Sequence, residues 1–265
     1  MKRFIGKVAI ITGSGKGIGK AIAIDFAREG AKVILVSRTE KDLINVSEEI
    51  KRAGSKSLVV KADVSKEDDV KKIFKKTIKE YKTLDILVNN AAIQVRNHIL
   101  YIPTDEWKKH IDINLTGVFF CMREALKIMV KNNYGKIVNI SSNMGKKGFS
   151  TTSSYSASKF GILGLTEASA ADLVDKNINI NAICPAGVET PLAHKSYPDI
   201  DFSKVKLMKP EEISKVVLFL ASDDAKAIKG SFIDVCGGQK LLNGDECNEI
   251  NKIFKLLGNN YFQIV

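Results

Sequence analysis

The chain has 265 residues, of which 45% are hydrophobic and 27% are charged, the ordinary proportions of a soluble globular protein. The net charge of +11 would suit a nucleic-acid binder, but the lysines are spread along predicted helix faces, without the clusters of aromatic residues and arginines found in single-strand binders. We therefore expect no nucleic-acid partner. No run of about 18 apolar residues suggests a membrane span, so a membrane partner is not expected either.

Strand-like and helix-like patterns alternate along the chain. The predicted strands are 7–12, 32–37, 57–62, 86–89, 136–141, 178–184 and 231–235. The predicted helices are 17–29, 40–52, 66–81, 105–131, 153–176 and 211–221. Continuous apolar strands separated by helices indicate a parallel sheet covered on both faces. We predict an α/β fold of the Rossmann type, with a doubly wound seven-stranded sheet in a single domain.

Two segments fall outside this alternation. Residues 187–210 are irregular and follow the sixth predicted strand. Because ligands of such sheets bind beyond the carboxyl ends of the strands, we interpret these residues as a lid segment. Residues 241–265 carry a helical pattern and an apolar end, and two alternatives stay open for this tail: packing on the catalytic domain of residues 1–240, or contact with a partner subunit.

The cysteine pattern gives no sign of a metal site. The four cysteines are Cys121, Cys184, Cys236 and Cys247, and no two of them form a C-x-x-C pair. Cys121 and Cys184 lie in apolar contexts and are interpreted as small core residues, which suits a reducing compartment. Since the N-terminus also lacks the apolar stretch of a signal peptide, we expect a cytoplasmic protein.

A glycine-rich turn links the first predicted strand to the first predicted helix. It consists of Gly13, Ser14, Gly15, Lys16, Gly17, Ile18 and Gly19. The spacing differs from G-x-G-x-x-G, but glycines at this place let the phosphates of a dinucleotide approach the helix N-terminus. We predict that the turn binds a dinucleotide cofactor.

The end of the second predicted strand indicates which dinucleotide binds. NAD sites of this architecture place Asp or Glu there to hold the ribose 2′-hydroxyl. This chain has Ser37 and Arg38 instead. Arg38 would neutralise a 2′-phosphate, and Lys16 would add a second positive charge. We predict NADP in preference to NAD, with the alternative that Arg38 is only an exposed residue before a helix.

Polar residues also follow the third and fourth predicted strands. Asp63 is a candidate acceptor for the adenine amino group, or alternatively a turn or helix-capping residue. The Asn89 and Asn90 amides are expected to stabilise the sheet and border the ribose.

Tyr155 and Lys159 lie four residues apart on a predicted helix and therefore share one face. An ammonium beside a phenol favours the phenolate, so we expect Lys159 to lower the pKa of Tyr155 and to make it a better proton donor and acceptor. Combined with the nucleotide site, this pair predicts hydride transfer to or from a carbonyl.

These pieces occur in an order that resembles the short-chain dehydrogenase/reductase family over roughly residues 7–238. The matching pieces are the glycine turn, Asp63, Asn89-Asn90-Ala91, Asn114, Ser142, Tyr155-x-x-x-Lys159, and Thr190 after Pro185. Within the family, the chain is most similar to the members that include 3-oxoacyl-carrier-protein reductases, sugar dehydrogenases and hydroxysteroid dehydrogenases.

The resemblance implies specific roles. Tyr155 would be the general acid or base, Lys159 would also bind the nicotinamide ribose, and Ser142 would hold the substrate oxygen. Asn114 would interrupt its helix and anchor a proton-relay water; alternatively it is a mid-helix polar residue, and Ser142 a strand-end turn residue with Ser141 as its rival. Further cofactor contacts are implied for Asp63, Val64, Asn90, Ala91, Pro185, Gly187, Val188 and Thr190.

Three positions depart from the family pattern. Ala92 takes the last place of Asn-Asn-Ala-Gly, Ala186 separates Pro185 from Gly187, and Cys236 takes the aspartate place of Val-Asp-Gly-Gly. The lid segment also looks short for the family, which indicates a more open substrate site or one completed by the tail or a partner subunit.

The substrate is expected to be a small carbonyl or alcohol, which the sequence does not name. The predicted pocket residues are Gln94, Val95, Asn143, Met144, Phe149, Ala186, His194 and Tyr197. By resemblance, helices 105–131 and 153–176 would pair with their equivalents in a homotetramer. The small residues expected at that interface are Ala157, Gly161, Gly164, Ala168 and Ala171.

Two other functions are considered beside an NADP-dependent oxidoreductase. One is an NAD-dependent sugar or alcohol dehydrogenase. The other is a non-catalytic nucleotide sensor, against which the intact set of Asn114, Ser142, Tyr155 and Lys159 argues, because a sensor needs no proton donor.

Overall fold

The computed structural model describes residues 2–237, and the predicted tail 241–265, with Cys247, lies outside them. Within the described residues, seven strands form one parallel sheet in the order β3-β2-β1-β4-β5-β6-β7. The strands are β1 (Val8–Thr12), β2 (Lys32–Ser37), β3 (Ser57–Lys61), β4 (Ile86–Asn89), β5 (Gly135–Ile140), β6 (Ile178–Pro185) and β7 (Phe232–Val235). The predicted doubly wound Rossmann-type sheet is confirmed.

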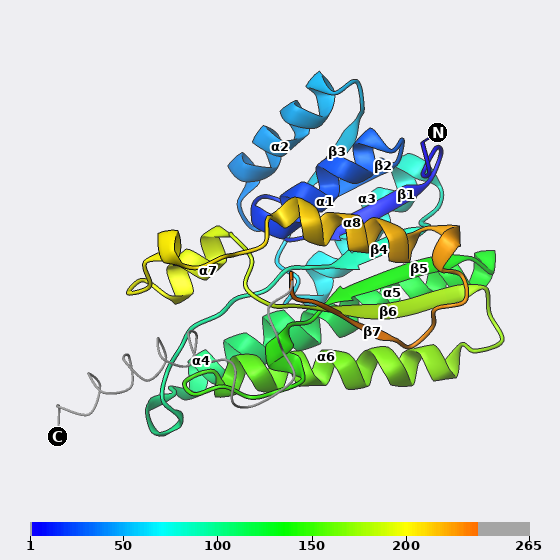
Figure 1. Ribbon diagram of the computed structural model, residues 1–265. Coiled ribbons are helices and arrows are strands. Elements are labelled where there is room, and N and C mark those ends of the chain that lie inside the picture. Colours follow the sequence, from blue (N-terminus) through cyan, green and yellow to red (C-terminus); the bar gives the residue numbers. More distant parts are fainter. Residues whose placement is uncertain (1, 238–265) are drawn as a thin grey trace.

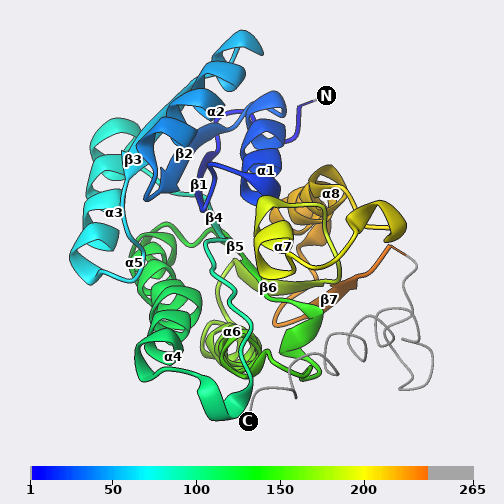
Figure 2. The ribbon, with the colours of Figure 1, turned by 90° about the vertical axis from the view of Figure 1, so that its left-hand side faces the viewer.

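Helices cover both faces of the sheet (Figures 1 and 2). The helices are α1 (Gly17–Arg28), α2 (Glu40–Arg52), α3 (Glu67–Tyr81), α4 (Thr104–Ile111), α5 (Gly117–Asn132), α6 (Ser153–Asp172), α7 (Pro191–Ser196) and α8 (Pro210–Ala221). One apolar layer joins the sheet to α1, α2 and α8, and the other joins it to α3, α5 and α6. Because both faces are buried, the central strands are apolar at almost every position, as the sequence predicts.

The strand order positions the site. β1 lies between β2 and β4, so the chain leaves β1 toward one edge of the sheet and later returns to build the other half from β4 onward. The loops that follow β1 and β4 therefore diverge at their carboxyl ends and leave a crevice, the usual ligand site of an open α/β sheet. Figure 2 shows α7 beside the same end of the sheet, near α8.

The structure corrects three predicted elements. The predicted helix 105–131 is interrupted between α4 and α5 by a π-helical segment, Asp112–Thr116. The predicted helix 153–176 ends at Asp172 as α6. The lid segment is not wholly irregular, because it contains α7 and the 3₁₀ turn Phe202–Lys204.

Two further expectations concern the described part of the chain alone. None of its helices is long and apolar enough to cross a membrane. Cys121, Cys184 and Cys236 are free thiols, and the first two are buried core residues as predicted.

Candidate active site

The glycine turn brings the chain backbone close to the loop after β4. Gly13 has φ of +66°, and a Cβ at this position would lie 2.8 Å from the Ala91 Cα. Gly17, the first residue of α1, has φ of +53°. Both residues have a positive φ, which favours glycine. Gly13 must in addition lack a side chain because of its close approach to Ala91.

The N-terminus of α1 suits an anion. Its N-cap residue, Lys16, forms no side-chain cap hydrogen bond, and the first turn holds no acidic residue. The first amide N–H groups of a helix lack intrahelical partners and carry a partial positive charge, so they favour a phosphate group. The residues present thus fit the pyrophosphate of a dinucleotide.

A hollow extends from this turn toward the end of β3, and eight of the nineteen predicted cofactor residues line it. It is lined by Gly13, Gly15, Lys16, Val36, Ser37, Arg38, Thr39, Asp42, Ala62, Asp63, Val64, Ala91, Ala92 and Ile113. Arg38 is exposed and forms no hydrogen bond or ion pair within the described part of the chain. The Lys16 ammonium lies 3.1 Å from the Asp42 carboxylate, a partner that the sequence alone did not indicate.

Asp63 closes a local turn at the edge of this hollow. Its Oδ1 accepts hydrogen bonds from the Ser65 backbone N–H at 3.0 Å and from the Ser65 hydroxyl at 2.7 Å. The structure thus shows the turn-forming role that the sequence left as the alternative, while Asp63 still lines the hollow.

Thr12 and Asn90 join the two loops at the crevice. The Thr12 hydroxyl accepts hydrogen bonds from the backbone N–H groups of Asn90 and Ala91, at 2.9 Å and 3.1 Å. In return, the Asn90 amide donates to the carbonyls of Thr12 at 3.0 Å and Gly13 at 3.2 Å. Asn89, directed into the sheet, donates to Asn139 Oδ1 at 2.8 Å. These bonds hold together the two loops that border the predicted nucleotide site.

Asn114 occupies the π-helical segment and is fully buried. Its Oδ1 accepts from the Ile93 N–H at 2.8 Å, and its amide donates to the Ile93 carbonyl at 2.9 Å and to the Ser158 hydroxyl at 3.1 Å. Ser158 lies one residue before Lys159 and donates to the Tyr155 carbonyl at 2.7 Å. Asn114 therefore ties the loop after β4 to the turn of α6 that carries the predicted catalytic pair. A widened turn of this kind is frequent at functional sites.

Tyr155, Lys159 and Ser142 meet at one cavity. Tyr155 and Lys159 point from α6 to the carboxyl end of β5, where the Lys159 ammonium donates to the Ile140 carbonyl at 2.8 Å. That ammonium lies 5.5 Å from the centre of the Tyr155 ring. The Ser142 hydroxyl lies 3.0 Å from Asn143 Oδ1 and accepts from the Met144 N–H at 3.1 Å. The single Ser142 hydroxyl proton can form a hydrogen bond either to Asn143 or to the Tyr155 oxygen.

Burial controls the protonation of the pair. It raises the pKa of the Tyr155 phenol, and the hydrogen bond with Ser142 offsets this only in part. Burial also lowers the pKa of Lys159 from 10.5 to about 7. The sequence predicts a lowered pKa for Tyr155, whereas the structure gives the opposite direction. The reason is that the phenol itself is desolvated, while the Lys159 ammonium lies 5.5 Å from the centre of the ring and donates to the Ile140 carbonyl instead.

A family model for short chain dehydrogenases matches residues 7–201, which is most of the chain. The chain belongs to the short-chain dehydrogenase family. Among its relatives is the 3beta-hydroxysteroid dehydrogenase of Mediterraneibacter gnavus, 38% identical over 90% of this chain and 96% of that protein. Another is the 3-oxoacyl-[acyl-carrier-protein] reductase FabG of Thermotoga maritima, 36% identical over 89% of this chain and 98% of that protein.

Solved structures of the family agree closely with this fold. Levodione reductase superposes with a TM-score of 0.87 at 33% identity, over 91% of this chain and all of that chain. A single-residue variant of the actinorhodin polyketide ketoreductase, solved with NADPH, superposes with a TM-score of 0.84 at 31% identity, over 88% of this chain and 96% of that chain. The prediction of an oxidoreductase enzyme of the short-chain dehydrogenase class is confirmed.

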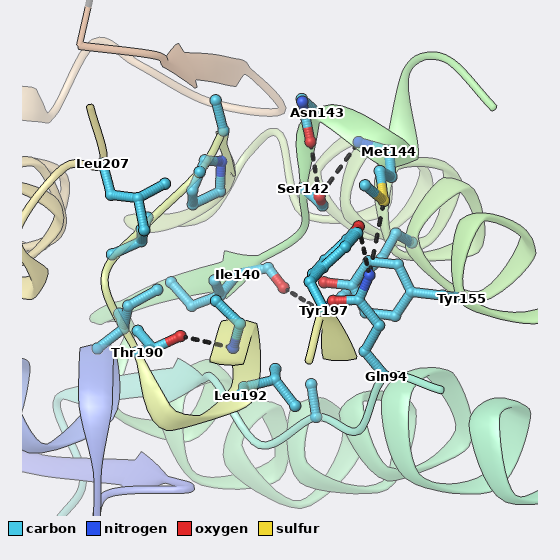
Figure 3. Close-up of a pocket in the computed structure, with 18 of the residues that line it drawn as sticks. Gln94, Ile140, Ser142, Asn143, Met144, Tyr155, Thr190, Leu192, Tyr197 and Leu207 are labelled. Atoms are coloured by element: carbon cyan, nitrogen blue, oxygen red, sulfur yellow. Dashed lines mark hydrogen bonds between the residues drawn. The ribbon is translucent and has the colours of Figure 1, made fainter. Parts of the chain in front are cut away.

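This short-chain dehydrogenase has a cavity of about 230 Å³ beside Tyr155 (Figure 3). Six of the eight predicted pocket residues line it, and Val95 and His194 do not. His194 is exposed instead, paired with Glu189 and in contact with Phe202 through tilted rings. The predicted cofactor residues Ile18, Asn90, Pro185, Gly187, Val188 and Thr190 also line the cavity.

The predictions from sequence did not include the apolar wall of the cavity. That wall includes Leu192, Ala193, Ile200, Phe202, Val205 and Leu207 of the lid segment. A signal was present in the sequence, because apolar and polar residues interleave over residues 200–207 of this segment. Ala92, one of the departures from the family pattern, does not have a positive φ, so alanine fits there without backbone strain.

Proposed function

We propose that this enzyme is an NADP-dependent oxidoreductase that transfers hydride between the nicotinamide cofactor and a ketone or secondary alcohol, with Tyr155 as general acid and base. The observation that carries the proposal is the meeting of Tyr155, Ser142 and Lys159 at one cavity, next to an uncapped helix N-terminus that suits a pyrophosphate. The polyketide ketoreductase of the same fold, whose structure was solved with NADPH, supports it.

The chain's own residues would act as follows. The glycine turn and the α1 N-terminus hold the phosphates, and Arg38 neutralises the 2′-phosphate. When bound, the cofactor supplies or accepts the hydride. Ser142 donates a hydrogen bond to the substrate oxygen, and Tyr155 gives its proton to the same oxygen during reduction. Asn114 keeps the α6 turn aligned through Ser158.

Tyr155→Phe tests the proton transfer. The substitution removes one hydroxyl from a side chain that is 7% exposed and leaves the glycine turn untouched, so we expect NADPH binding to persist while turnover is lost. Fluorescence titration with NADPH and a steady-state assay measure the two quantities separately. Persistent turnover would remove Tyr155 from the mechanism.

Arg38→Asp tests the cofactor preference. Arg38 is exposed at the end of β2, so the substitution leaves the core unchanged and replaces the cation with the carboxylate that suits a free 2′-hydroxyl. The ratio of kcat/KM for NADPH to that for NADH should fall by at least about tenfold, the equivalent of about 1.4 kcal/mol. An unchanged ratio would mean that another residue recognises the 2′-phosphate, or that NAD is the cofactor.

The assembly and location belong to the same proposal. α6 exposes Ala157, Gly164, Ala168 and Ala171 along one face, and a Cβ at Gly164 would meet no atom within 4 Å. Gly161 was also expected on that face, but a Cβ there would lie 2.7 Å from the Leu115 side chain of the same subunit. The small-residue face suits a close helix pair in a homotetramer. A cytoplasmic location stays a prediction from the cysteine pattern, and the absence of a nucleic-acid partner stays a prediction from the distribution of the lysines.

A further inference from the structure

The lid segment presents its apolar residues to the cavity and its polar residues to solvent. Leu192, Ile200, Phe202, Val205 and Leu207 line the cavity and are half-buried. The residues interleaved with the last four are exposed: Asp201, Ser203, Lys204 and Lys206. This alternation directs one apolar face of the segment toward the cavity, where it would contact a bound molecule.

The opposite side of the cavity carries no charge that is available to a substrate. Met144, Phe149 and the ring of Tyr197 contribute to it, and Figure 3 shows Met144 and Tyr197 near Tyr155. Among the described residues that line this cavity, the single ionisable cation is Lys159, and no carboxylate lines it. The nearby Lys146 is paired with Asp234 at 2.7 Å.

Gln94 contributes a neutral polar side chain to the cavity beside Tyr155. The Gln94 side-chain amide donates to the Tyr197 hydroxyl at 3.2 Å, and the Gln94 backbone carbonyl accepts from the Ser196 hydroxyl at 3.1 Å. The next residue is also fixed, because the Val95 N–H donates to the buried His110 ring at 3.1 Å. Gln94 therefore joins the lid segment to the loop after β4 and offers hydrogen bonding without charge.

From this cavity we infer that the substrate is a bulky, uncharged and largely apolar ketone, or the matching secondary alcohol. The inference rests on the proposed function, since it concerns the same site. Such a molecule would cover the apolar lid residues, and removing their apolar surface from water favours binding. A polyhydroxylated sugar would leave hydroxyl groups facing hydrocarbon. A carboxylate or phosphate would meet no cation of the described lining other than Lys159, whose ammonium already donates to the Ile140 carbonyl.

The test compares three ketones with NADPH: 2-decalone as the apolar probe, 5-keto-D-gluconate as the sugar acid, and acetoacetyl-coenzyme A as the anionic thioester. We expect kcat/KM for 2-decalone to exceed the other two by at least about tenfold, the order expected of a hydrophobic pocket. If the sugar acid or the thioester is preferred, the inference is overturned while the proposed oxidoreductase function stands.

Two variants of the lid segment test whether its apolar face causes the preference for the apolar ketone. Val205→Lys introduces a cation into the apolar face, and Ser203→Lys places the same cation on the exposed face of the same segment. Val205→Lys should lower kcat/KM for 2-decalone by about tenfold or more. Ser203→Lys should leave it within about twofold, and the affinity for NADPH should stay unchanged in both. Equal effects of the two variants would overturn the inference.

If no ketone is reduced, the proposed function fails, and binding then decides the inference. Equilibrium dialysis of 2-decalone against the wild-type protein should show saturable binding that Val205→Lys weakens and Ser203→Lys does not. Absence of saturable binding would overturn the inference by itself.

Discussion

Replacing Lys159 by Met should stabilise the ligand-free protein at neutral pH. The side chain is 2% exposed, and burial lowers its pKa from 10.5 to about 7. The unfolded chain therefore holds this proton more tightly than the folded chain, so the stability of the wild type rises with pH between about 7 and 10.5. Since each pH unit in that interval is worth about 1.4 kcal/mol, the folded state loses about 5 kcal/mol through Lys159 below pH 7.

The assay is urea unfolding of the wild type and of Lys159→Met at fixed protein concentration, from pH 6 to pH 10. The lost hydrogen bond to the Ile140 carbonyl shifts the difference in stability by a constant, about 1 kcal/mol. The advantage of the variant should shrink by about 1.4 kcal/mol per pH unit above pH 7. Titration of groups that do not interact with Lys159 cancels in the difference, and the exposed Lys72→Met controls for the lost charge. A difference that does not change with pH would refute the desolvation argument.

Two other substitutions test the framework around the pair. Gly19→Ala would place a Cβ against the Gly13 carbonyl and the Asn90 amide, so it should cost about 1–3 kcal/mol of stability and weaken NADPH binding, measured by urea unfolding and fluorescence titration. Gly148→Ala, where a Cβ would meet nothing within 4 Å, should change neither, and a similar loss in both would refute the steric reason. Asn114→Leu should lower kcat and cost about 1–3 kcal/mol, because Ile93 loses both partners; full activity would show that the bridge to α6 is dispensable.

Local chemistry explains which features the sequence predicts well. The strands are read from continuous apolar runs, because both faces of a parallel sheet are buried. Gly13 and Gly17 mark a turn whose backbone only glycine adopts easily, and the helical spacing of Tyr155 and Lys159 places both at one cavity. Each of these signals depends on residues close together in the chain.

Contacts between distant segments explain what the sequence misses. The π-helical segment around Asn114 depends on bonds to Ile93, a partner 21 residues away, which no helical periodicity contains. Lys16 pairs with Asp42 of α2, and His110 reaches back to Val95. The alternation of apolar residues in the lid segment is visible in the sequence. The cavity that these residues face is not, because its other walls come from β5, β6 and α6.

The protonation of the predicted catalytic pair follows from the same long-range packing. The sequence shows that Tyr155 and Lys159 are neighbours, and a neighbouring cation lowers the pKa of a phenol. The sequence does not show that the N-terminal turns of α6, the end of β5 and the lid segment exclude water from both groups. Desolvation disfavours the ammonium as well as the phenolate, and no carboxylate among the described lining residues compensates. The folded chain alone thus favours the neutral phenol, the form that donates a proton to a carbonyl oxygen. Oxidation of an alcohol requires the phenolate, and the lysine supports that form only while it holds its own proton.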